Sequence, residues 1–228
     1  MRNGKKLIIQ FFLNLKIQRR FIWFIFFAVF VGCSKPLFRS AWIKNVAPEK
    51  FKAKFETSKG NFEIEVIRKQ SPKAVDRFFQ LLKHHILDNS VFYRVVPKFV
   101  VQFGNNDSTV IKPWEEYKIS DEPTFYSNTR GTLSFARGGK ETRSMQLFIN
   151  LIDNSRLDTI KFEGVQGFPA FGKVIKGMVV VDSIYSGYGN SPMYKLDTLN
   201  YNRYQFLKIY PKLDIIKKAY LIKYKSIE

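Results

Sequence analysis

Alternating apolar and polar positions begin at Phe51 and predict a β-hairpin. FKAKFET, residues 51–57, alternates with a period of two, and FEIEVI, residues 62–67, does the same. Between them, SKGN supplies a turn that contains Gly60. A period of two places every second side chain on one face of a sheet, so this face is expected to be buried.

The next segment changes to a helical period. Residues 71–86, SPKAVDRFFQLLKHHI, carry their apolar side chains on one face of a predicted helix. Ser71 is the predicted N-cap and Pro72 the first helical position. His84 and His85 fall in the last turn and point in different directions, so a solvated helix end is expected there and no joint metal site.

Short apolar runs dominate the rest of the chain. A loop is predicted over 105–130, a short helix over 176–187, and one or two strands near the end. Many short strands with one helix early and another late predict a mainly β fold, a closed antiparallel barrel capped by two α-helices. The runs that predict further strands are SVFYRVV (90–96), KFVVQFG (98–104), GTLSFAR (131–137), MQLFINL (145–151) and PAFGKVI (169–175).

The first 33 residues have the pattern of a targeting segment. Six Lys and Arg residues and no acid precede FIWFIFFAVFVG, residues 21–32. This run is shorter than the about 20 residues that cross a bilayer, but it fits the apolar region of a signal peptide. Cys33, the single cysteine, follows directly. VFVGCSK, residues 29–35, resembles the lipobox of bacterial lipoproteins.

That resemblance implies that the Cys33 side chain is lipidated and anchors the protein to a bacterial cell envelope. Ser34 after the cysteine favours the periplasmic face of the outer membrane. The other interpretation of Cys33 is a buried free thiol at the end of an uncleaved anchor helix. In either case no second thiol is present in the sequence for a disulfide or a cysteine-based zinc site.

The patterns divide the chain into four parts. Residues 1–32 are the predicted signal peptide, and 33–50, with two prolines and no sustained period, are the predicted tether. The folded domain is predicted over 51–215 and a basic C-terminal tail over 216–228. The lysines of this tail suit contact with anionic lipid. The domain is expected to be monomeric.

Composition supports a packed domain and argues against a nucleic-acid partner. The 228 residues are 45% hydrophobic and 16% aromatic, which supplies an ample core. The formal net charge is +19, and part of it belongs to the predicted signal peptide. The remaining basic residues are spread along the chain and form no known nucleic-acid motif, so no nucleic acid is expected as a partner.

The sequence lacks the short motifs of covalent and metal-dependent enzymes. It contains no G-x-S-x-G, no phosphate-binding glycine loop, no H-E-x-x-H and no C-x-x-C. A nucleophile paired with a histidine is hard to build from two adjacent histidines and one lipobox cysteine. We therefore expect an enzyme made from this chain to use no metal and no cofactor.

Four blocks of sequence resemble the cyclophilin-type peptidyl-prolyl cis-trans isomerases, in the order and spacing of that family. The resemblance covers roughly residues 52–187. It implies a cyclophilin-like fold, an eight-stranded antiparallel barrel closed by two helices, which agrees with the hydrophobic pattern. It also implies proline-containing polypeptides as substrates. The blocks are FYRVVPKFVVQFG (92–104), RGTLSFARGG (130–139), MQLFINLIDNSRLD (145–158) and FPAFGKVIKGM (168–178).

The resemblance also assigns roles to residues of this chain. Arg94 falls on the family's catalytic arginine, and Phe99, Val100 and Gln102 on the line of site residues that follows it. Ala136 and Arg137 fall on a segment whose backbone holds the substrate chain. The residues that fall on the lining and rim of the proline pocket, or close to it, are Gln146, Phe148, Leu157 and Phe168.

Physical chemistry explains why an arginine suits this role. Rotation about an X–Pro bond crosses a barrier of about 18–20 kcal/mol because it breaks amide resonance. The twisted prolyl nitrogen regains a lone pair, and a guanidinium aimed at it binds the twisted state better than the planar one. Arg94 is cationic at any working pH.

Alternatives remain for the site and for the protein. Arg94 alone could be a salt-bridged strand residue, Phe99 and Phe148 core residues, and Gln146 a partner for barrel backbone groups. Val100 replaces a common methionine, and Phe103 and Met145 depart from the family pattern. The leading hypothesis is an isomerase that assists the folding of exported proteins. The second is a cyclophilin-shaped module that binds proline-containing segments without useful turnover.

Overall fold

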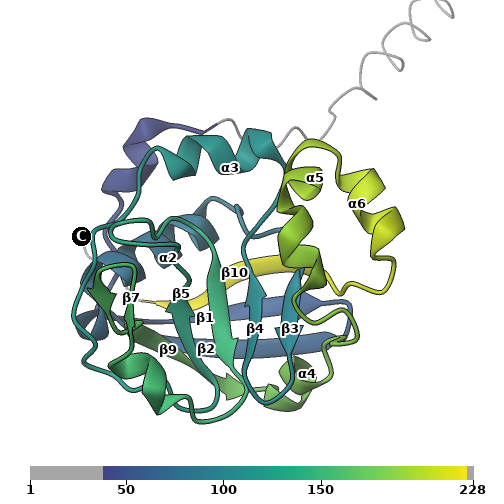
Figure 1. Cartoon of the computed structure of the whole chain (residues 1–228). Coiled ribbons are helices and arrows are strands. Elements are labelled where there is room, and N and C mark those ends of the chain that lie inside the picture. The colour runs from purple at the N-terminus through teal and green to yellow at the C-terminus, as the bar shows by residue number, and fades with distance from the viewer. Residues whose placement is uncertain (1–37, 225–228) are drawn as a thin grey trace, which may run out of the picture. The chain divides into compact units, whose positions relative to one another are not determined.

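Eight strands form one strongly curled antiparallel sheet (Figure 1). In this computed structural model the described residues are 38–224, and side chains are described as far as residue 222. The strand order across the sheet is β10-β1-β2-β9-β5-β6-β4-β3. The eight strands are β1 (Lys50–Thr57), β2 (Gly60–Ile67), β3 (Arg94–Val96), β4 (Val100–Phe103), β5 (Thr132–Phe135), β6 (Leu147–Asn150), β9 (Ala170–Lys176) and β10 (Ile216–Tyr224), and a separate ribbon pairs β7 (Lys161–Phe162) with β8 (Val165–Gln166).

The sheet curls far enough for its first and last strands to approach each other. β3 and β10 are the two ends of the strand order, and an isolated antiparallel bridge between Val91 and Ile215 links the segments beside them. The Phe92 amide also donates to the Asp214 carbonyl at 3.0 Å. The predicted eight-stranded antiparallel sheet is confirmed, but the closure is only partial because no continuous ladder joins β3 to β10.

The described residues form more helices than the sequence pattern predicts. The two predicted helices correspond to α2 and α4, and α4 ends well before Gly187. α3 lies inside the predicted loop 105–130, and α5 and α6 lie near the chain's end, where only strands were predicted. The helices are α2 (Pro72–Lys83), α3 (Ser108–Glu115), α4 (Met178–Asp182), α5 (Leu196–Tyr201) and α6 (Arg203–Ile209), with 3-10 turns η1 (Ser40–Lys44), η2 (Arg68–Gln70), η3 (Ser155–Asp158) and η4 (Ser191–Lys195).

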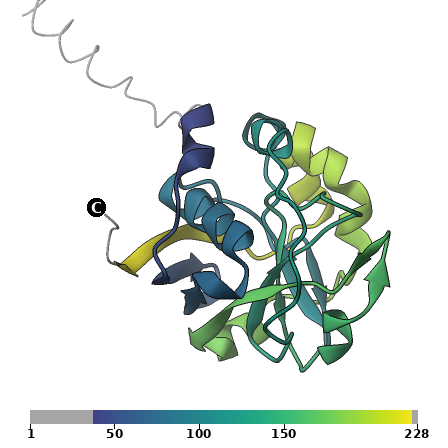
Figure 2. The ribbon, with the colours of Figure 1, turned by 90° about the vertical axis from the view of Figure 1, so that its left-hand side faces the viewer.

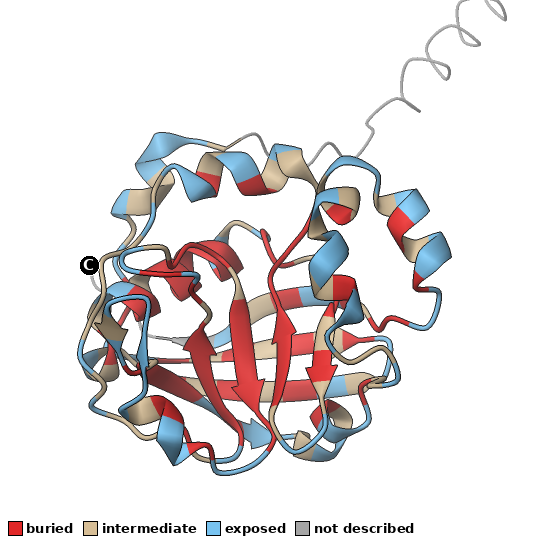
Figure 3. Ribbon diagram, in the orientation of Figure 1, coloured by how far each residue is buried: buried red, intermediate tan, exposed pale blue. Residues whose placement is uncertain are grey.

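The core is an aromatic cluster between the concave face of the sheet and α2. Alternation along β1 and β2 puts Phe55 and Phe62 on this face, where their rings stack with centroids 4.7 Å apart. Phe78 of α2 also stacks on Phe55, with ring centroids 6.3 Å apart. Figure 3 shows the buried strands and the buried face of α2. Phe103, a departure from the family pattern, is fully buried here against Phe55 and Phe92.

The domain begins earlier than the sequence pattern predicts. Residues 38–49 belong to the predicted tether, yet η1 packs on the end of α2 (Figure 2). The ring of Trp42 stacks on His84 at 4.0 Å, and burial is the main cause that lowers the pKa of this histidine. Gln80 donates to the carbonyls of Ile43 and Asn45 at 2.9 and 2.8 Å. These contacts hold the segment on the domain.

The prediction of a basic tail over 216–228 is wrong for most of that range. Residues 216–224 form β10, which pairs with β1 from Thr57–Ile216 to Phe51–Tyr224. The folded domain therefore extends to at least residue 224 and does not end at 215. Ala219 is buried in the core, which an unattached tail could not provide. The apolar positions of 216–224 alternate irregularly because β-bulges interrupt the pairing with β1.

The predicted signal peptide, Cys33 and the last residues of the chain lie outside the described residues. Between residues 38 and 224, no helix has both the length and the apolar character that a membrane span requires. In the same part of the chain, no three His, Cys, Asp or Glu side chains gather as a metal site would require.

The N-terminus of α2 is capped from a distant loop. Ser71 occupies the predicted N-cap position, but its hydroxyl donates to the Glu122 carboxylate and does not cap the helix. Glu122 instead accepts from the amides of Lys73 (2.8 Å) and Ala74 (3.1 Å). The same carboxylate lies 3.2 Å from Nη2 of Arg143, whose side chain is fully buried. One carboxylate thus joins the helix terminus to a buried cation.

Replacing Glu122 with glutamine should destabilise the domain markedly. The amide removes the negative charge that faces both the helix terminus and buried Arg143, so the free energy of unfolding should fall by about 2–3 kcal/mol. Denaturant titration measures this change. Glu49→Gln is the matched control, because Glu49 is exposed and lies 3.8 Å from Arg68, a surface pair worth about 0–1 kcal/mol. Equal stabilities of the two variants would contradict the role of Glu122.

Candidate functional site

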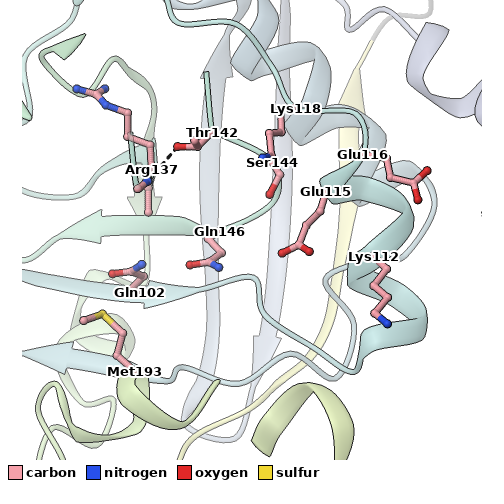
Figure 4. A pocket seen from close by; sticks show the side chains of 12 residues that line it. Gln102, Lys112, Glu115, Glu116, Lys118, Arg137, Thr142, Ser144, Gln146 and Met193 are labelled. Atoms are coloured by element: carbon pink, nitrogen blue, oxygen red, sulfur yellow. Dashed lines mark hydrogen bonds between the residues drawn. The ribbon is translucent and has the colours of Figure 1, made fainter. Parts of the chain in front are cut away.

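Two cavities lie next to each other on the outer surface of the sheet. The more apolar one, about 440 Å³, is lined by residues of β3, β4, β6 and the segment 156–168. The more polar one, about 710 Å³, extends towards α3 and the loop 138–144 (Figure 4). Residues that line both cavities join them into one groove, and they are Gln102, Ala136, Arg137 and Met193.

Arg94 is held at the edge of the apolar cavity by two amide side chains. Antiparallel pairing of β3 with β4 sets Arg94 opposite Gln102, and Nη1 of Arg94 donates to Gln102 Oε1 at 3.1 Å. Nε donates to Asn190 Oδ1 at 2.7 Å. Within the described part of the chain, Nη2 has no hydrogen-bond partner and so remains available to a ligand. Burial lowers the pKa of Arg94, and Tyr93 and Tyr194 offset part of that effect.

Two guanidinium groups lie near the ring of Phe99 in the apolar cavity. The Cζ atoms of Arg94 and Arg156 lie 5.5 and 4.9 Å from the centre of its ring. Arg156 itself is exposed. Phe99 and both arginines line the apolar cavity, and cation–π attraction to the two guanidinium groups keeps the orientation of the half-buried ring.

The floor of the apolar cavity is a small hydrophobic cluster distinct from the barrel core. Val100, Phe148 and Leu157 are buried in it, and Phe99, Ala136 and Phe168 pack around them. Phe148 and Phe168 meet edge to face with centroids 6.0 Å apart. Val95 and Val101, by contrast, point into the barrel core. Alternation along β3 and β4 thus separates the residues of the core from those of the cavity.

Arg137 supports the wall that carries Phe168. Its guanidinium lies 4.2 Å from the centre of the Phe168 ring and donates to the carbonyls of Gly167 and, at 3.1 Å, Val165. Burial lowers the pKa of Arg137, Asp121 raises it and Arg143 lowers it further. The resemblance assigned a role only to the backbone of this segment. In the structure, the side chain of Arg137 also supports the wall of the cavity.

Gln146 lies in the polar cavity, although the resemblance placed it in the lining of the proline pocket. Its Oε1 accepts from the hydroxyl of buried Tyr93 at 2.8 Å. Burial raises the pKa of Tyr93. Figure 4 shows Gln146 beside Gln102 on the neighbouring strand, with Met193 on one side and Glu115 and Lys112 of α3 on the other. Gln146 is therefore placed between the sheet and the polar part of the groove.

The structure brings together every predicted site residue that it describes. All of them except Gln146 line the apolar cavity. Met193, Ile160 and Phe162 complete the wall of this cavity and Asn190 holds Arg94 at its edge, but the sequence pattern indicates none of the four. No local pattern marks them, because Asn190 and Met193 are about a hundred residues from Arg94 in the chain. Ile160 and Phe162 are exposed apolar residues in a short loop and hairpin.

The chain is similar to proteins of one family. The family model described as cyclophilin-type peptidyl-prolyl cis-trans isomerase/CLD matches residues 52–201. A peptidyl-prolyl cis-trans isomerase of Acinetobacter baylyi is 35% identical over 131 residues, which cover 57% of this chain and 69% of that protein. Peptidyl-prolyl cis-trans isomerase B of Escherichia coli is 31% identical over 141 residues, and the match covers 57% of this chain and 81% of that protein.

Solved structures share the fold. A crystal structure of a Cryptosporidium parvum cyclophilin-type isomerase has a TM-score of 0.57 and 21% identity, and the match covers 77% of this chain and 99% of that one. A crystal structure of the same Cryptosporidium protein in the presence of the dipeptide Ala-Pro has a TM-score of 0.54, with 21% identity over 76% of this chain and 99% of that one.

Arg137→Lys should loosen the wall of the apolar cavity without unfolding the barrel. Lysine cannot donate to two carbonyls from a planar fork or stack as a guanidinium on Phe168. Hydrogen exchange of the Gly167 and Phe168 amides, which bond to Ile160 and Leu157 carbonyls at 2.9 and 2.8 Å, should become at least about tenfold faster. Arg156→Lys is the matched control, because among the described residues the Arg156 side chain makes no hydrogen bond to this wall and only its backbone carbonyl accepts from the Ile160 amide, at 3.0 Å. Unchanged exchange in Arg137→Lys would contradict the supporting role.

Proposed function

Because this chain belongs to the cyclophilin-type peptidyl-prolyl cis-trans isomerase family, we propose that its groove binds X–Pro segments and that Arg94 accelerates rotation about the X–Pro bond. The observation that carries this proposal is the position of Arg94, held by Gln102 and Asn190 beside an apolar cavity. The cavity offers aromatic and aliphatic walls to a proline ring. The presence of Ala-Pro with the related Cryptosporidium protein supports this class of ligand.

The proposed chemistry is a rotation in which no σ-bond forms or breaks. It therefore needs no nucleophile, and we propose that it needs no metal. The ring of proline rests on Phe148 and Leu157 while the preceding carbonyl swings. At the twisted state the prolyl nitrogen becomes pyramidal, and an N–H of Arg94 donates to its lone pair. In the planar ground state this lone pair is delocalised, so the interaction stabilises mainly the transition state.

Two features of the site strengthen that interaction. Arg94 is half-buried, so its charge is less screened than a fully exposed charge would be. Gln102 and Asn190 accept from two different nitrogens of the guanidinium, so little reorganisation is needed when the substrate twists. Since arginine is charged at any working pH, the rate should depend little on the protonation of this residue.

Arg94→Ala should reduce catalysis far more than it reduces the stability of the fold. We expect kcat/KM for a proline-containing tetrapeptide to fall by about a hundredfold to a thousandfold, because the donor to the twisted amide is lost. Arg94→Lys keeps the charge but loses the planar fork, so its rate should be intermediate. A protease-coupled isomerisation assay measures both variants.

Arg39→Ala is the control, because Arg39 is exposed and does not line either cavity. Its kcat/KM should equal that of the unchanged protein. If the unchanged protein and Arg94→Ala both give only the uncatalysed rate, the enzymatic proposal is wrong. The groove would then serve as a binding module for proline-containing segments.

We also propose that the substrates are exported proteins and that the enzyme is lipid-anchored at the cell envelope. The support is the sequence alone: the basic segment, the apolar run 21–32 and Cys33 in a lipobox-like setting. Uncatalysed X–Pro isomerisation takes tens to hundreds of seconds, slow enough to limit folding after export. An isomerase fixed to the envelope would act where those chains fold.

Intact mass of the protein extracted from a bacterial host tests the anchor. Cleavage before Cys33 and lipidation should give the mass of residues 33–228 plus a diacylglyceryl group, with or without a further acyl chain. Cys33→Ser removes the sulfur that carries the lipid, so this variant should lack the added mass and leave the membrane fraction at high salt. The mass of the unmodified 228-residue chain would contradict the proposal.

A further inference from the structure

One helical segment of the chain, residues 188–213, lies beside the groove but has no part in the sheet. It contains η4, α5 and α6 (Figure 1). The match to the family model ends at residue 201, inside this segment. It therefore includes structure beyond what the family match accounts for.

The helical segment has its own hydrophobic contact with the barrel. Leu199, Phe206 and Tyr210 are buried against Val91 and Tyr93, the residues that lead into β3. This cluster is separate from the main core. The segment is thus packed directly behind the strand that carries Arg94.

Polar contacts fix both ends of the helical segment. The Asp214 carboxylate, just after it, accepts from the Ser58 hydroxyl at 2.6 Å and from the Tyr185 amide at 2.8 Å. Within the segment, the hydroxyls of Ser191 and Tyr210 lie 3.1 Å apart. α5 also contacts α3, and Lys112 of α3 lies 5.5 Å from the centre of the Tyr201 ring. The first turn of the helical segment, η4, is therefore tied to its end through Ser191 and Tyr210.

Asn190, at the start of that first turn, lies next to Arg94. Asn190 Oδ1 accepts from Nε at 2.7 Å, which is shorter than the 3.1 Å bond from Nη1 to Gln102. One acceptor would leave the guanidinium free to turn about a single hydrogen bond. Two acceptors on different nitrogens fix the plane of the fork, and with it the direction of Nη2.

We propose that Asn190 is a positioning residue for Arg94 and that the helical segment 188–213 holds it in place. This inference rests on the proposed role of Arg94. Met193, three residues further on, lines both cavities, so the same turn also forms a wall of the groove. The segment therefore ties the orientation of Arg94 to the shape of the substrate site. Asn190 itself acts only through the guanidinium.

Asn190→Ala tests the proposal in the full-length protein. The variant keeps Arg94 and Gln102, but the guanidinium loses one of its two acceptors. We expect kcat for a proline tetrapeptide to fall about tenfold, since misorientation of a reacting group costs one to two orders of magnitude. KM should change by less than about twofold, because the apolar cavity is intact. Thermal unfolding should be unchanged.

Asn190→Asp provides a rescue that a merely structural role would not predict. Aspartate has nearly the same shape and retains the oxygen that accepts from Nε. Its kcat should recover to within about threefold of the unchanged protein, with the remaining loss due to the added negative charge beside the guanidinium. A kcat of Asn190→Asp as low as that of Asn190→Ala would overturn the proposal.

Asn202→Ala is the matched control in the same helical segment. Asn202 caps α6 by accepting from the Gln205 amide at 3.0 Å and does not contact Arg94. Its kcat should equal that of the unchanged protein. An equal loss in Asn202→Ala and Asn190→Ala would assign the effect to general loosening and overturn the proposal.

Arg94→Ala, measured alongside, separates this inference from the proposed function. If Arg94→Ala keeps full activity, the proposed function fails and Asn190 has no catalytic group to position. If Arg94→Ala loses activity while Asn190→Ala keeps the kcat of the unchanged protein, the proposed function stands and the positioning role of Asn190 is wrong.

Discussion

Antiparallel pairing between β3 and β4 is the constraint on which the site depends. The pairing sets Arg94 opposite Gln102 and Val95 opposite Val101. Because neighbouring residues of a strand face opposite sides, the valines enter the barrel core while the arginine and the glutamine face the groove. A shift of one residue in this register would bury the cation and expose the core. Packing of the core therefore fixes the orientation of the site.

Buried charged residues also hold loops against the barrel. Glu122 links the N-terminus of α2 to buried Arg143, and Arg77 of α2 donates to the carbonyls of Ser144, at 2.9 Å, and Tyr117. Burial lowers the pKa of Arg77 to about 10, so it is still cationic at neutral pH. Ser144 lines the polar cavity. The position of this wall of the polar cavity thus depends on the buried arginines of the domain.

Segments without a place in the sheet complete the groove. α3 supplies charged residues to the polar cavity, and the helical segment 188–213 supplies Met193 and the second acceptor for Arg94. Both are anchored on the barrel and on each other. The barrel provides a frame for the groove, and these helices supply the charged wall of its polar cavity and the second acceptor for Arg94. This division of labour is common where a shared fold serves different substrates.

The amino-acid sequence alone predicts β1, β2, α2 and most of the residues of the groove. Period-two alternation marked β1 and β2 because one face of each is buried, and four blocks of family resemblance located the groove from Arg94 to Phe168. Features that depend on contacts between distant segments could not be predicted in this way. Glu122, and not Ser71, caps α2. Gln146 accepts from Tyr93 in the polar cavity. Residues 216–224 form a strand because they pair with the free edge of β1. Asn190 joined Arg94 only through folding, since a hydrogen bond between residues so far apart in the chain leaves no local pattern.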